Sequence, residues 1–358
     1  MHKLTVIDQT VQCLRQGIES GQWRGELPGV MLLATEFNVS GQTMQAALKL
    51  LEEEGWIVSQ GVGKPRRAVR KCDPEERQSV SLRVGLIVPC DAGLDSPGTE
   101  RMISTIVSEL KEAGHRPRLT SKSMRSFDFD PGRIFRMVTR LEMDAWVVAG
   151  AEMGLLEMMA SAGISLISLG GAEHPAIPCV GLKSGEALRN CTRRLITLGH
   201  RRIVLVAPPN WRKPILTPLV KLYLSELADA GIAPSAYHLP DWDQSAGNFK
   251  FLLQSLFSLT PPTALIVGDY MELIAVMEFL RLRGLRVPED VSVVVMQDDP
   301  ALCWFGSDIA RFSADLGGIP GRIVDWVGDV TSGRRDVRKV FFETSFIEGD
   351  SIGPAHGE

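Results

Sequence analysis

Residues 263–300 of this 358-residue chain read TALIVGDYMELIAVMEFLRLRGLRVPEDVSVVVMQDDP. Two runs within this stretch, ALIV and VSVVV, are short and continuously apolar, as strands buried on both faces of a parallel sheet are. Between them the apolar side chains from Met271 to Leu282 recur at helical spacing, and Gly284 provides a stop for the helix. A strand, a helix and a second strand in this order predict one unit of an α/β fold with a parallel sheet.

The same alternation of strands and helices begins at Leu82 and continues through most of the chain. Further strands are expected at 82–89, 144–150, 164–170 and 201–209, and further helices at 99–115, 153–163, 185–200 and 219–232, with another helix starting at Asp315. The region is longer than one usual doubly wound domain, so we expect two α/β lobes.

The first part of the chain has a different pattern, in which three helices are predicted before Gly55. The first is marked by apolar residues at helical spacing, which are Ile7, Val11, Leu14 and Ile18. The second follows Pro28, and its expected buried side is formed by Leu32, Leu33 and Phe37. The third follows a tight turn at 38–40, and Ser40 is a suitable N-cap for it.

Two short strands are expected after the third helix, at 56–58 and 67–69, on either side of a glycine-rich tip at 61–63. Three helices followed by a two-stranded wing predict a winged helix-turn-helix. In such modules the helix after the tight turn lies in the major groove of DNA, where its exposed side chains reach the base edges.

The third helix, in NVSGQTMQAALKLLEEEGWIV (38–58), has one apolar and one polar face. The apolar face, formed by Met44, Ala47, Leu48 and Leu51, is expected to pack on the other two helices. The polar face suits base edges, since Gln reads adenine bidentately and Lys reaches guanine or phosphate. The wing adds cations that would neutralise phosphates. The candidate DNA-binding residues are Ser40, Gln42, Thr43, Gln45, Lys49, Lys64, Arg66 and Arg67.

An alternative interpretation is that this polar row is a solvated helix face and that 64–71 is a basic linker. A single amphipathic helix would favour that interpretation, but its combination with a tight turn, a wing and a basic tip favours binding of double-stranded DNA. The basic cluster is local, because the net charge of the whole chain is −4.

Composition indicates an ordinary globular protein, with 44% hydrophobic and 23% charged residues. The sequence has no apolar run long enough for a bilayer and no signal-peptide pattern, so we expect a cytoplasmic protein that makes no membrane contact. The six cysteines are scattered and the histidines are not at ligand spacing, which favours reduced thiols and gives no support for a metal site or a cofactor.

Residues 4–70 resemble the GntR-type winged-helix family. The positions that carry the resemblance are Leu27-Pro28, Val39-Ser40, Ala47-Leu48, Leu51, Glu54-Gly55 and Ile57. The family usually has arginine at three positions that here hold Met31, Gly41 and Gln45. We therefore expect weaker phosphate anchoring by the helix, a greater contribution from the wing, and an operator that family habits do not predict.

Residues 82–350 resemble the sensor domain of LacI-type repressors, which is related to periplasmic sugar-binding proteins. The resemblance is carried by Leu198–Ile203, Asp229–Ile232 and, most specifically, the stretch 263–300. It implies two similar lobes joined by crossing strands, an interlobe cleft for a small molecule such as a sugar, and a side-by-side homodimer. The expected divisions are a winged helix-turn-helix at 1–70, a linker at 71–81 and a two-lobed domain at 82–358.

Ligands of open α/β sheets bind beyond the carboxyl ends of the strands, and the resemblance places effector contacts there. It implies that Asp298 accepts hydrogen bonds from sugar hydroxyls and that Trp242 stacks on a sugar ring. The family has a ligand-facing arginine where this chain has Leu219, so Arg212 and Lys213, just upstream, are substitute candidates. Asp91, after the first strand, is a weaker candidate.

Asp269 follows another strand, but the contacting position in the family is the preceding one, here Gly268. Each candidate has a structural alternative. Asp269 and Asp315 are suited to capping the helices that follow them, and Asp298 could cap a turn before Pro300. Trp242 could line the core or the cleft without touching a ligand.

The sequence therefore predicts a transcription regulator, a repressor as most relatives are, controlled by a small-molecule effector. The alternatives are a sugar-binding protein or a carbohydrate-acting enzyme without a DNA role. The enzyme is less well supported, since GVGKP fails as a phosphate loop at Pro65 and no nucleophile–base pair stands out. We single out no catalytic residue.

Overall fold

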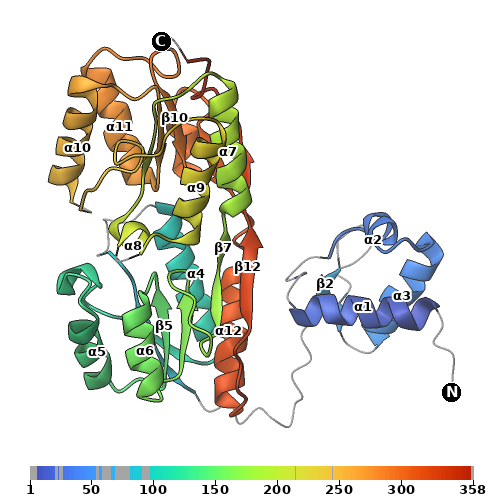
Figure 1. Ribbon diagram of the computed structural model, residues 1–358. Coiled ribbons are helices and arrows are strands. Elements are labelled where there is room, and N and C mark those ends of the chain that lie inside the picture. The colour runs from blue at the N-terminus through green and yellow to red at the C-terminus, as the bar shows by residue number, and fades with distance from the viewer. Residues whose placement is uncertain are drawn as a thin grey trace.

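The computed structural model describes residues 6–20, 23, 27–53, 56–58, 66–68, 81–90, 97–213, 215–243 and 245–355. Its N-terminal part holds helices α1 (Val6–Ser20), α2 (Val30–Glu36) and α3 (Gly41–Glu53). Strands β1 (Ile57–Val58) and β2 (Arg67–Ala68) pair antiparallel. The predicted winged helix-turn-helix is confirmed, and these residues are called the head below (Figure 1).

The head has a core of its own, to which all three helices contribute. The predicted inward face of α3 is confirmed, because Met44, Ala47, Leu48 and Leu51 are all buried. Leu33 of α2 and Leu14 of α1 lie in the same cluster. The prediction for Leu32 is wrong, since its side chain is 67% exposed. Leu33 and Ala34 form the buried side of this short helix, and Leu32 precedes them by about a quarter turn.

The first lobe, called the N-lobe, contains a six-stranded parallel sheet in the order β12-β7-β6-β5-β3-β4. Its strands are β3 (Arg83–Ile87), β4 (Arg116–Leu119), β5 (Ala145–Ala149), β6 (Leu166–Leu169), β7 (Cys179–Lys183) and β12 (Lys339–Glu343). One face packs against α4 (Pro97–Glu112) and α12 (Gly318–Thr331), and the other against α5 (Pro131–Arg140) and α6 (Met153–Ser161). Burial on both faces explains the apolar strand sequences.

The second lobe, the C-lobe, has a five-stranded sheet in the order β13-β11-β10-β9-β8, in which β13 is antiparallel to β11. The strands are β8 (Ile203–Val206), β9 (Ala264–Val267), β10 (Ser292–Val295), β11 (Ala310–Ser313) and β13 (Ser345–Ile347). Helices α7 (Gly185–Thr197) and α9 (Pro218–Asp229) cover one face, and α10 (Ala246–Leu259) and α11 (Tyr270–Leu282) the other. The α/β fold with two parallel-sheet lobes is confirmed.

The chain passes between the lobes three times. It leaves the N-lobe from β7 to α7, returns from β11 to α12, and leaves again from β12 to β13. Two crossings touch each other, because the N–H of Thr344 donates to the carbonyl of Lys183 at 3.3 Å and the hydroxyls of Ser184 and Thr344 lie 3.3 Å apart. β7 and β12 therefore run side by side into a shared hinge (Figure 1).

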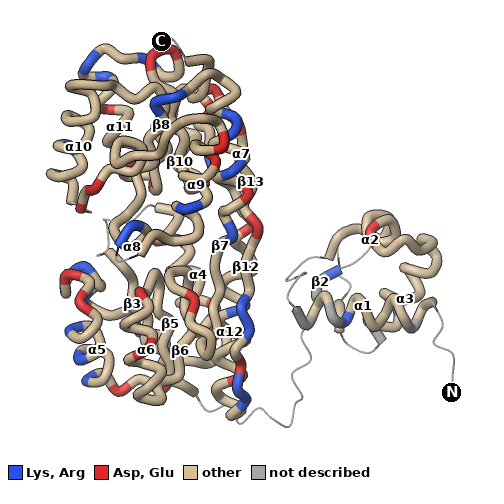
Figure 2. The backbone as a smooth tube through the Cα atoms, viewed as in Figure 1, with Lys and Arg blue, Asp and Glu red and all other residues tan. Residues whose placement is uncertain are grey.

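Charged residues of both signs are interspersed over the two lobes, without a large single-sign face in the view of Figure 2. Within the described residues, no helix has the length and apolarity that a bilayer span requires. The same residues contain no group of three or more potential metal ligands.

Candidate DNA-binding surface and effector cleft

The start of α3 is fixed by a side-chain cap. Ser40 Oγ accepts the N–H of Thr43 at 3.1 Å and lies 2.8 Å from the Thr43 hydroxyl. A serine that satisfies one of the first N–H groups of a helix is a favourable N-cap, so this prediction for Ser40 is confirmed. Ser40 and Thr43 are both engaged in this cap, so two of the candidate residues stabilise the start of α3.

Beyond the cap, the polar row of α3 lies on the surface as expected. Gln42, Gln45 and Lys49 are exposed, while Met44 and Leu48 on the opposite side are buried. Between α3 and the wing lies a shallow depression lined by Gln42, Gln45, Ala46, Lys49, Glu52 and Arg66. The head therefore brings five of the candidate or neighbouring polar side chains to one surface.

Arg66 joins this surface through its backbone and its side chain. Its carbonyl accepts the N–H of Leu27 at 2.7 Å, and its Nε donates to Glu52 Oε1 at 2.8 Å. Sequence reasoning did not single out Glu52, because 14 residues separate it from its partner. Lys64 lies outside the described residues, and for Arg67 the structure describes its place in β2 but not its side chain.

In the C-lobe, β8, β9 and β10 are parallel neighbours, so that their carboxyl ends lie at one edge of the sheet. Asp269 follows β9 and is the N-cap of α11, where its Oδ1 accepts the N–H of Glu272 at 2.8 Å. The capping alternative for Asp269 is therefore the observed arrangement. Asp298, after β10, accepts from Arg311 Nε at 3.1 Å and from the hydroxyl of Ser313.

Capping before Pro300 is the role of Asp299 and not of Asp298. Asp299 Oδ1 accepts the N–H of Ala301 at 2.8 Å at the start of the 3-10 helix η3 (Pro300–Trp304). The capping alternative for Asp298 is thus wrong by one residue, since Asp298 is engaged by Arg311 and Ser313 instead. Asp315 also differs from expectation, since α12 begins at Gly318 and Asp315 accepts only the N–H of Gly317.

Arg212 is buried, at the end of the short helix α8 (Pro209–Arg212). Its Nε donates to the carbonyl of Ala207 at 3.0 Å, and its terminal nitrogens bind the carboxylate of Asp241 and the carbonyl of Trp242. Hydrogen bonds from Lys213 and Arg212 lower the pKa of Asp241. In this structure Arg212 therefore fixes the segment that carries Trp242.

Trp242 is held at both ends of its side chain. Its indole Nε1 donates to the carbonyl of Ala207 at 2.9 Å, and its ring lies 5.0 Å from that of Phe249. It is half-buried against the C-lobe core. Asp91, the remaining effector candidate, lies outside the described residues.

Two further charged groups near these strand ends were missed from the sequence. Glu272 is buried, accepts the N–H of Gly268 at 2.7 Å, and has its pKa raised to about 8, mainly by burial and also by the charge of Asp269. The second group is Arg125 of the N-lobe, whose charge affects the pKa of two carboxylates in the C-lobe. Burial raises the pKa of Asp269, and the positive charge of Arg125 partly offsets this rise. The pKa of Asp243 is lowered mainly by a hydrogen bond from Ser245, and the charge of Arg125 lowers it further.

A signal for Glu272 was present, since it lies at N-cap spacing from Asp269. Arg125 gave no such signal, because it lies in the short helix η2 (Arg125–Phe127) that no sequence pattern marked. The two lobes therefore bring a cation and several carboxylates to the strand ends where a ligand of this fold would bind.

Comparison with protein families assigns the two parts separately. Residues 6–63 match the bacterial regulatory proteins of the gntR family. Residues 192–352 match the periplasmic binding protein-like domain. The chain joins a GntR-type domain to a periplasmic-binding-protein-like domain. The GntR-type match is to regulatory proteins, in agreement with the expectation of a transcription regulator and not of an enzyme.

Solved structures share the fold of this chain at low sequence identity. The complex of the transcriptional regulator CelR with cellobiose is 18% identical, with 91% of this chain and 100% of that chain covered and a TM-score of 0.61. A LacI family regulator from Enterococcus faecium with bound ribose is 15% identical, with 76% and 99% covered and a TM-score of 0.60. A search of the curated proteins gives no significant match.

A third structure, the LacI family regulator CCPA from Weissella paramesenteroides with bound sucrose, is 18% identical, with 76% of this chain and 99% of that chain covered and a TM-score of 0.60. At such identities these structures support the fold of the periplasmic-binding-protein-like domain and not its ligand.

Proposed function

We propose that this regulator binds an operator in double-stranded DNA through α3 and the wing, and that a sugar-like effector in the interlobe cleft controls this binding. As most LacI-type relatives do, it would act as a repressor. The observation that carries the proposal is the row of Gln42, Gln45 and Lys49 on α3, exposed on a head whose three helices share a core on their inward faces. A helix held in this way can enter a major groove without unfolding its own core.

The effector is proposed from the chemistry at the C-lobe strand ends. Asp298 is half-exposed and bound to Arg311 and Ser313, which can orient its carboxylate toward ligand hydroxyls. Trp242, held against Ala207 after β8, supplies an apolar ring in the same lobe. The relatives with bound cellobiose, ribose and sucrose support a carbohydrate as the ligand class.

Control of DNA binding needs two copies and two lobe arrangements. Paired heads match paired half-sites at a fixed spacing, so we propose a homodimer. The C-lobe exposes large apolar side chains that a second copy could cover, since Trp304 is 87% exposed, Met271 43% and Ile274 38%. An effector shifts the equilibrium between the two lobe arrangements only if it binds one arrangement more tightly than the other.

Selection from a random duplex library with the full chain tests the DNA role. We expect one enriched sequence with two half-sites, and Gln45→Ala should change the preferred base at one position of each half-site. Failure to enrich any sequence contradicts the proposal. A reporter promoter carrying the selected operator then tests repression, since a repressor lowers expression and its effector restores it.

A thermal-shift panel of monosaccharides, disaccharides and nucleosides tests the effector, because a ligand that binds only the folded state raises its stability by mass action. Ribose, cellobiose and sucrose belong in the panel. Asp298→Asn should abolish the shift that a binding sugar causes and leave DNA binding intact. An unchanged shift would remove Asp298 from the site.

A further inference from the structure

Glu52 and Arg66 form an ion pair on the DNA-facing surface of the head. The pair joins the last turn of α3 to the residue before β2, and the side chains of Arg66 and Glu52 are only 25% and 27% exposed, respectively. Both residues line the same depression as Gln42, Gln45 and Lys49. A carboxylate is an unexpected component of this surface, since it repels the phosphate groups that cations of a wing normally bind.

The geometry of the contact leaves the end of the guanidinium available. Glu52 binds the Nε of Arg66, and the carbonyl of Arg66 is fixed by the N–H of Leu27. Among the described residues, neither terminal amino group of Arg66 has an acceptor. A guanidinium held by its Nε keeps a forked pair of donors, which is the geometry that fits the O6 and N7 acceptors of guanine.

The net charge of the ion pair indicates whether Arg66 would contact a guanine or a phosphate. Arg66 and Glu52 together carry no net charge, so the pair contributes little to counterion release when DNA binds. The guanine edge is uncharged and is not repelled by Glu52, whereas a phosphate beside the pair is. The carboxylate therefore reduces the value of Arg66 as a phosphate contact and retains its value as a base contact.

We propose that Arg66 reads a guanine in the operator and that Glu52 is a positioning residue that orients the guanidinium and keeps this surface from binding phosphate indiscriminately. The inference rests on the proposed DNA-binding function. It assigns the neighbouring wing cations to the phosphates and Arg66 to a base.

Four head variants, compared with wild type by duplex selection and by salt titration of the selected operator and of a scrambled duplex, test this assignment. Arg66→Ala and Arg66→Lys should both lose one guanine preference per half-site and weaken operator binding about tenfold or more. Arg66→Ala also leaves the charge of Glu52 unpaired, so the scrambled duplex is compared in Arg66→Lys, which keeps the local charge and should show the wild-type salt slope. Lysine keeps the charge but lacks the fork, so loss in both variants identifies bidentate readout.

Two Glu52 variants separate orientation from charge. Glu52→Gln keeps an acceptor for Nε but removes the negative charge, so the scrambled duplex should bind several-fold tighter with a salt slope steeper by about 1. Glu52→Ala should show the same gain and also lose the guanine preference, because nothing holds the guanidinium. Glu157→Gln changes the net charge equally on an exposed site of α6 and should alter neither measurement.

A flatter salt slope in Arg66→Ala with the selected sequence unchanged overturns the assignment and makes Arg66 a phosphate contact. Unchanged selection and slope in both Glu52 variants, with only a lower thermal midpoint, overturns the role of Glu52 and leaves a structural ion pair. If wild type itself selects no sequence, the proposed function fails, which is a different result from either of these.

Discussion

Asp299 of the C-lobe binds Gly98 of the N-lobe, with its Oδ2 accepting the backbone N–H at 2.7 Å. The carboxylate is 1% exposed and lies at the first turn of α4. A second contact lies beside it, since Gln297 Nε2 donates to the hydroxyl of Thr99 at 3.2 Å. The loop after β10 therefore holds the N-terminus of a helix in the other lobe, where a negative charge is favoured by the helix dipole.

Asp299→Ala should destabilise the chain by about 1–3 kcal/mol, because the N–H groups of Gly98 and Ala301 both lose their acceptor. It should also let the lobes separate, which small-angle scattering would detect as a larger radius of gyration. Asp298→Ala is the control, because among the described residues this carboxylate bonds to Arg311 and Ser313 within the C-lobe and the radius should stay unchanged. An unchanged radius in Asp299→Ala would show that the hinge alone sets the lobe arrangement.

Stability should fall as pH rises toward 8 because of Glu272. Its pKa is about 8 in the folded chain against 4.5 for the ordinary side chain. Between these values the folded state holds a proton that the unfolded state has lost, so raising the pH favours unfolding. Glu272→Gln should remove this loss, which is on the order of 2–5 kcal/mol between pH 5 and 8.

Urea unfolding at several pH values measures this effect as the difference between wild type and Glu272→Gln. The difference is needed because burial lowers the pKa of His115, His200 and His238, which costs stability as pH falls below about 6.5. Glu278→Gln, on an exposed part of α11, is the control. Parallel pH profiles for wild type and Glu272→Gln would mean that Glu272 ionises normally.

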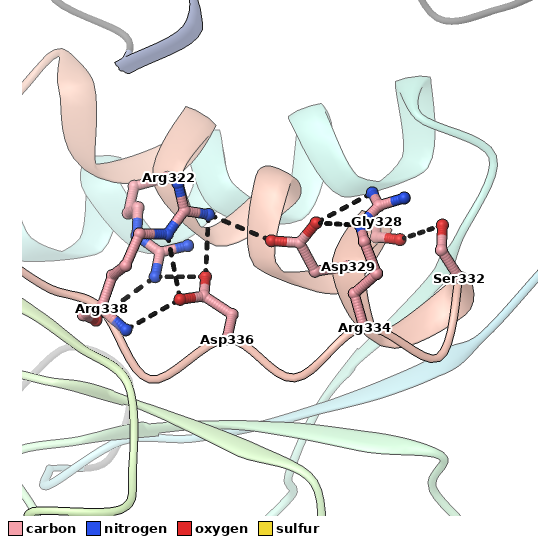
Figure 3. A network of polar contacts seen from close by, with 7 residues as sticks. All are labelled: Arg322, Gly328, Asp329, Ser332, Arg334, Asp336 and Arg338. Atoms are coloured by element: carbon pink, nitrogen blue, oxygen red, sulfur yellow. Dashed lines mark hydrogen bonds and ion pairs between the residues drawn. The ribbon is translucent and has the colours of Figure 1, made fainter.

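The buried ion pair of Arg322 and Asp336 should be among the most sensitive sites in the N-lobe (Figure 3). Their side chains are almost fully buried and 2.6 Å apart, and Arg338 bridges Asp336 to Asp329. Asp336→Ala would leave the Arg322 charge buried and poorly compensated, at a cost of about 3–5 kcal/mol. Within the described residues the Nε and Nη1 of Arg322 already have no acceptor.

Arg322→Met should therefore cost less than Asp336→Ala, because it removes the buried charge together with its unsatisfied donors. Arg334→Ala breaks an exposed contact to Asp329 in the same network and should change the free energy of unfolding by about 1 kcal/mol or less. Chemical denaturation ranks the three variants. A larger loss in Arg322→Met than in Asp336→Ala would contradict this account.

Arg212→Met should disturb the segment that carries Trp242 more than the loss of a single charge suggests. The change removes the donor to the carbonyls of Ala207 and Trp242 and a partner of Asp241. We expect a loss of about 2–4 kcal/mol and a change in the tryptophan fluorescence, since Trp242 loses its support. Lys213→Ala removes only an exposed partner of Asp241 and should have little effect. Equal effects would show that Arg212 is not the anchor.

Local sequence patterns were sufficient to predict helices with a capping residue and an apolar face, and strands with a continuous apolar run. Ser40 and the apolar positions of α3 predicted its start and its buried face, and the apolar runs at β9 and β10 predicted buried strands. Edge strands gave no such signal. β4 has the sequence RPRL and is mostly exposed, and β12 has charged residues at both ends, so neither shows an apolar run.

The candidate sites were predictable as positions but not as contacts. That Asp269 and Asp298 follow parallel strands could be read from the sequence, whereas the bonding of Asp298 to Arg311 depends on how β10 and β11 pair. Asp299 is a clear case, since its partner Gly98 is 201 residues away and in the other lobe. Residue type and spacing contain no information on such distances.

The order of the crossings determines how the C-lobe could be exchanged for that of another protein. The head precedes β3 in the chain, so its covalent attachment is to the N-lobe, and the C-lobe is formed by two segments, from α7 to β11 and from β13 onward. Both segments start next to the contact between Ser184 and Thr344. Chimaeras joined there would exchange the whole C-lobe, with its share of the proposed effector contacts, and would leave the head and its proposed operator unchanged.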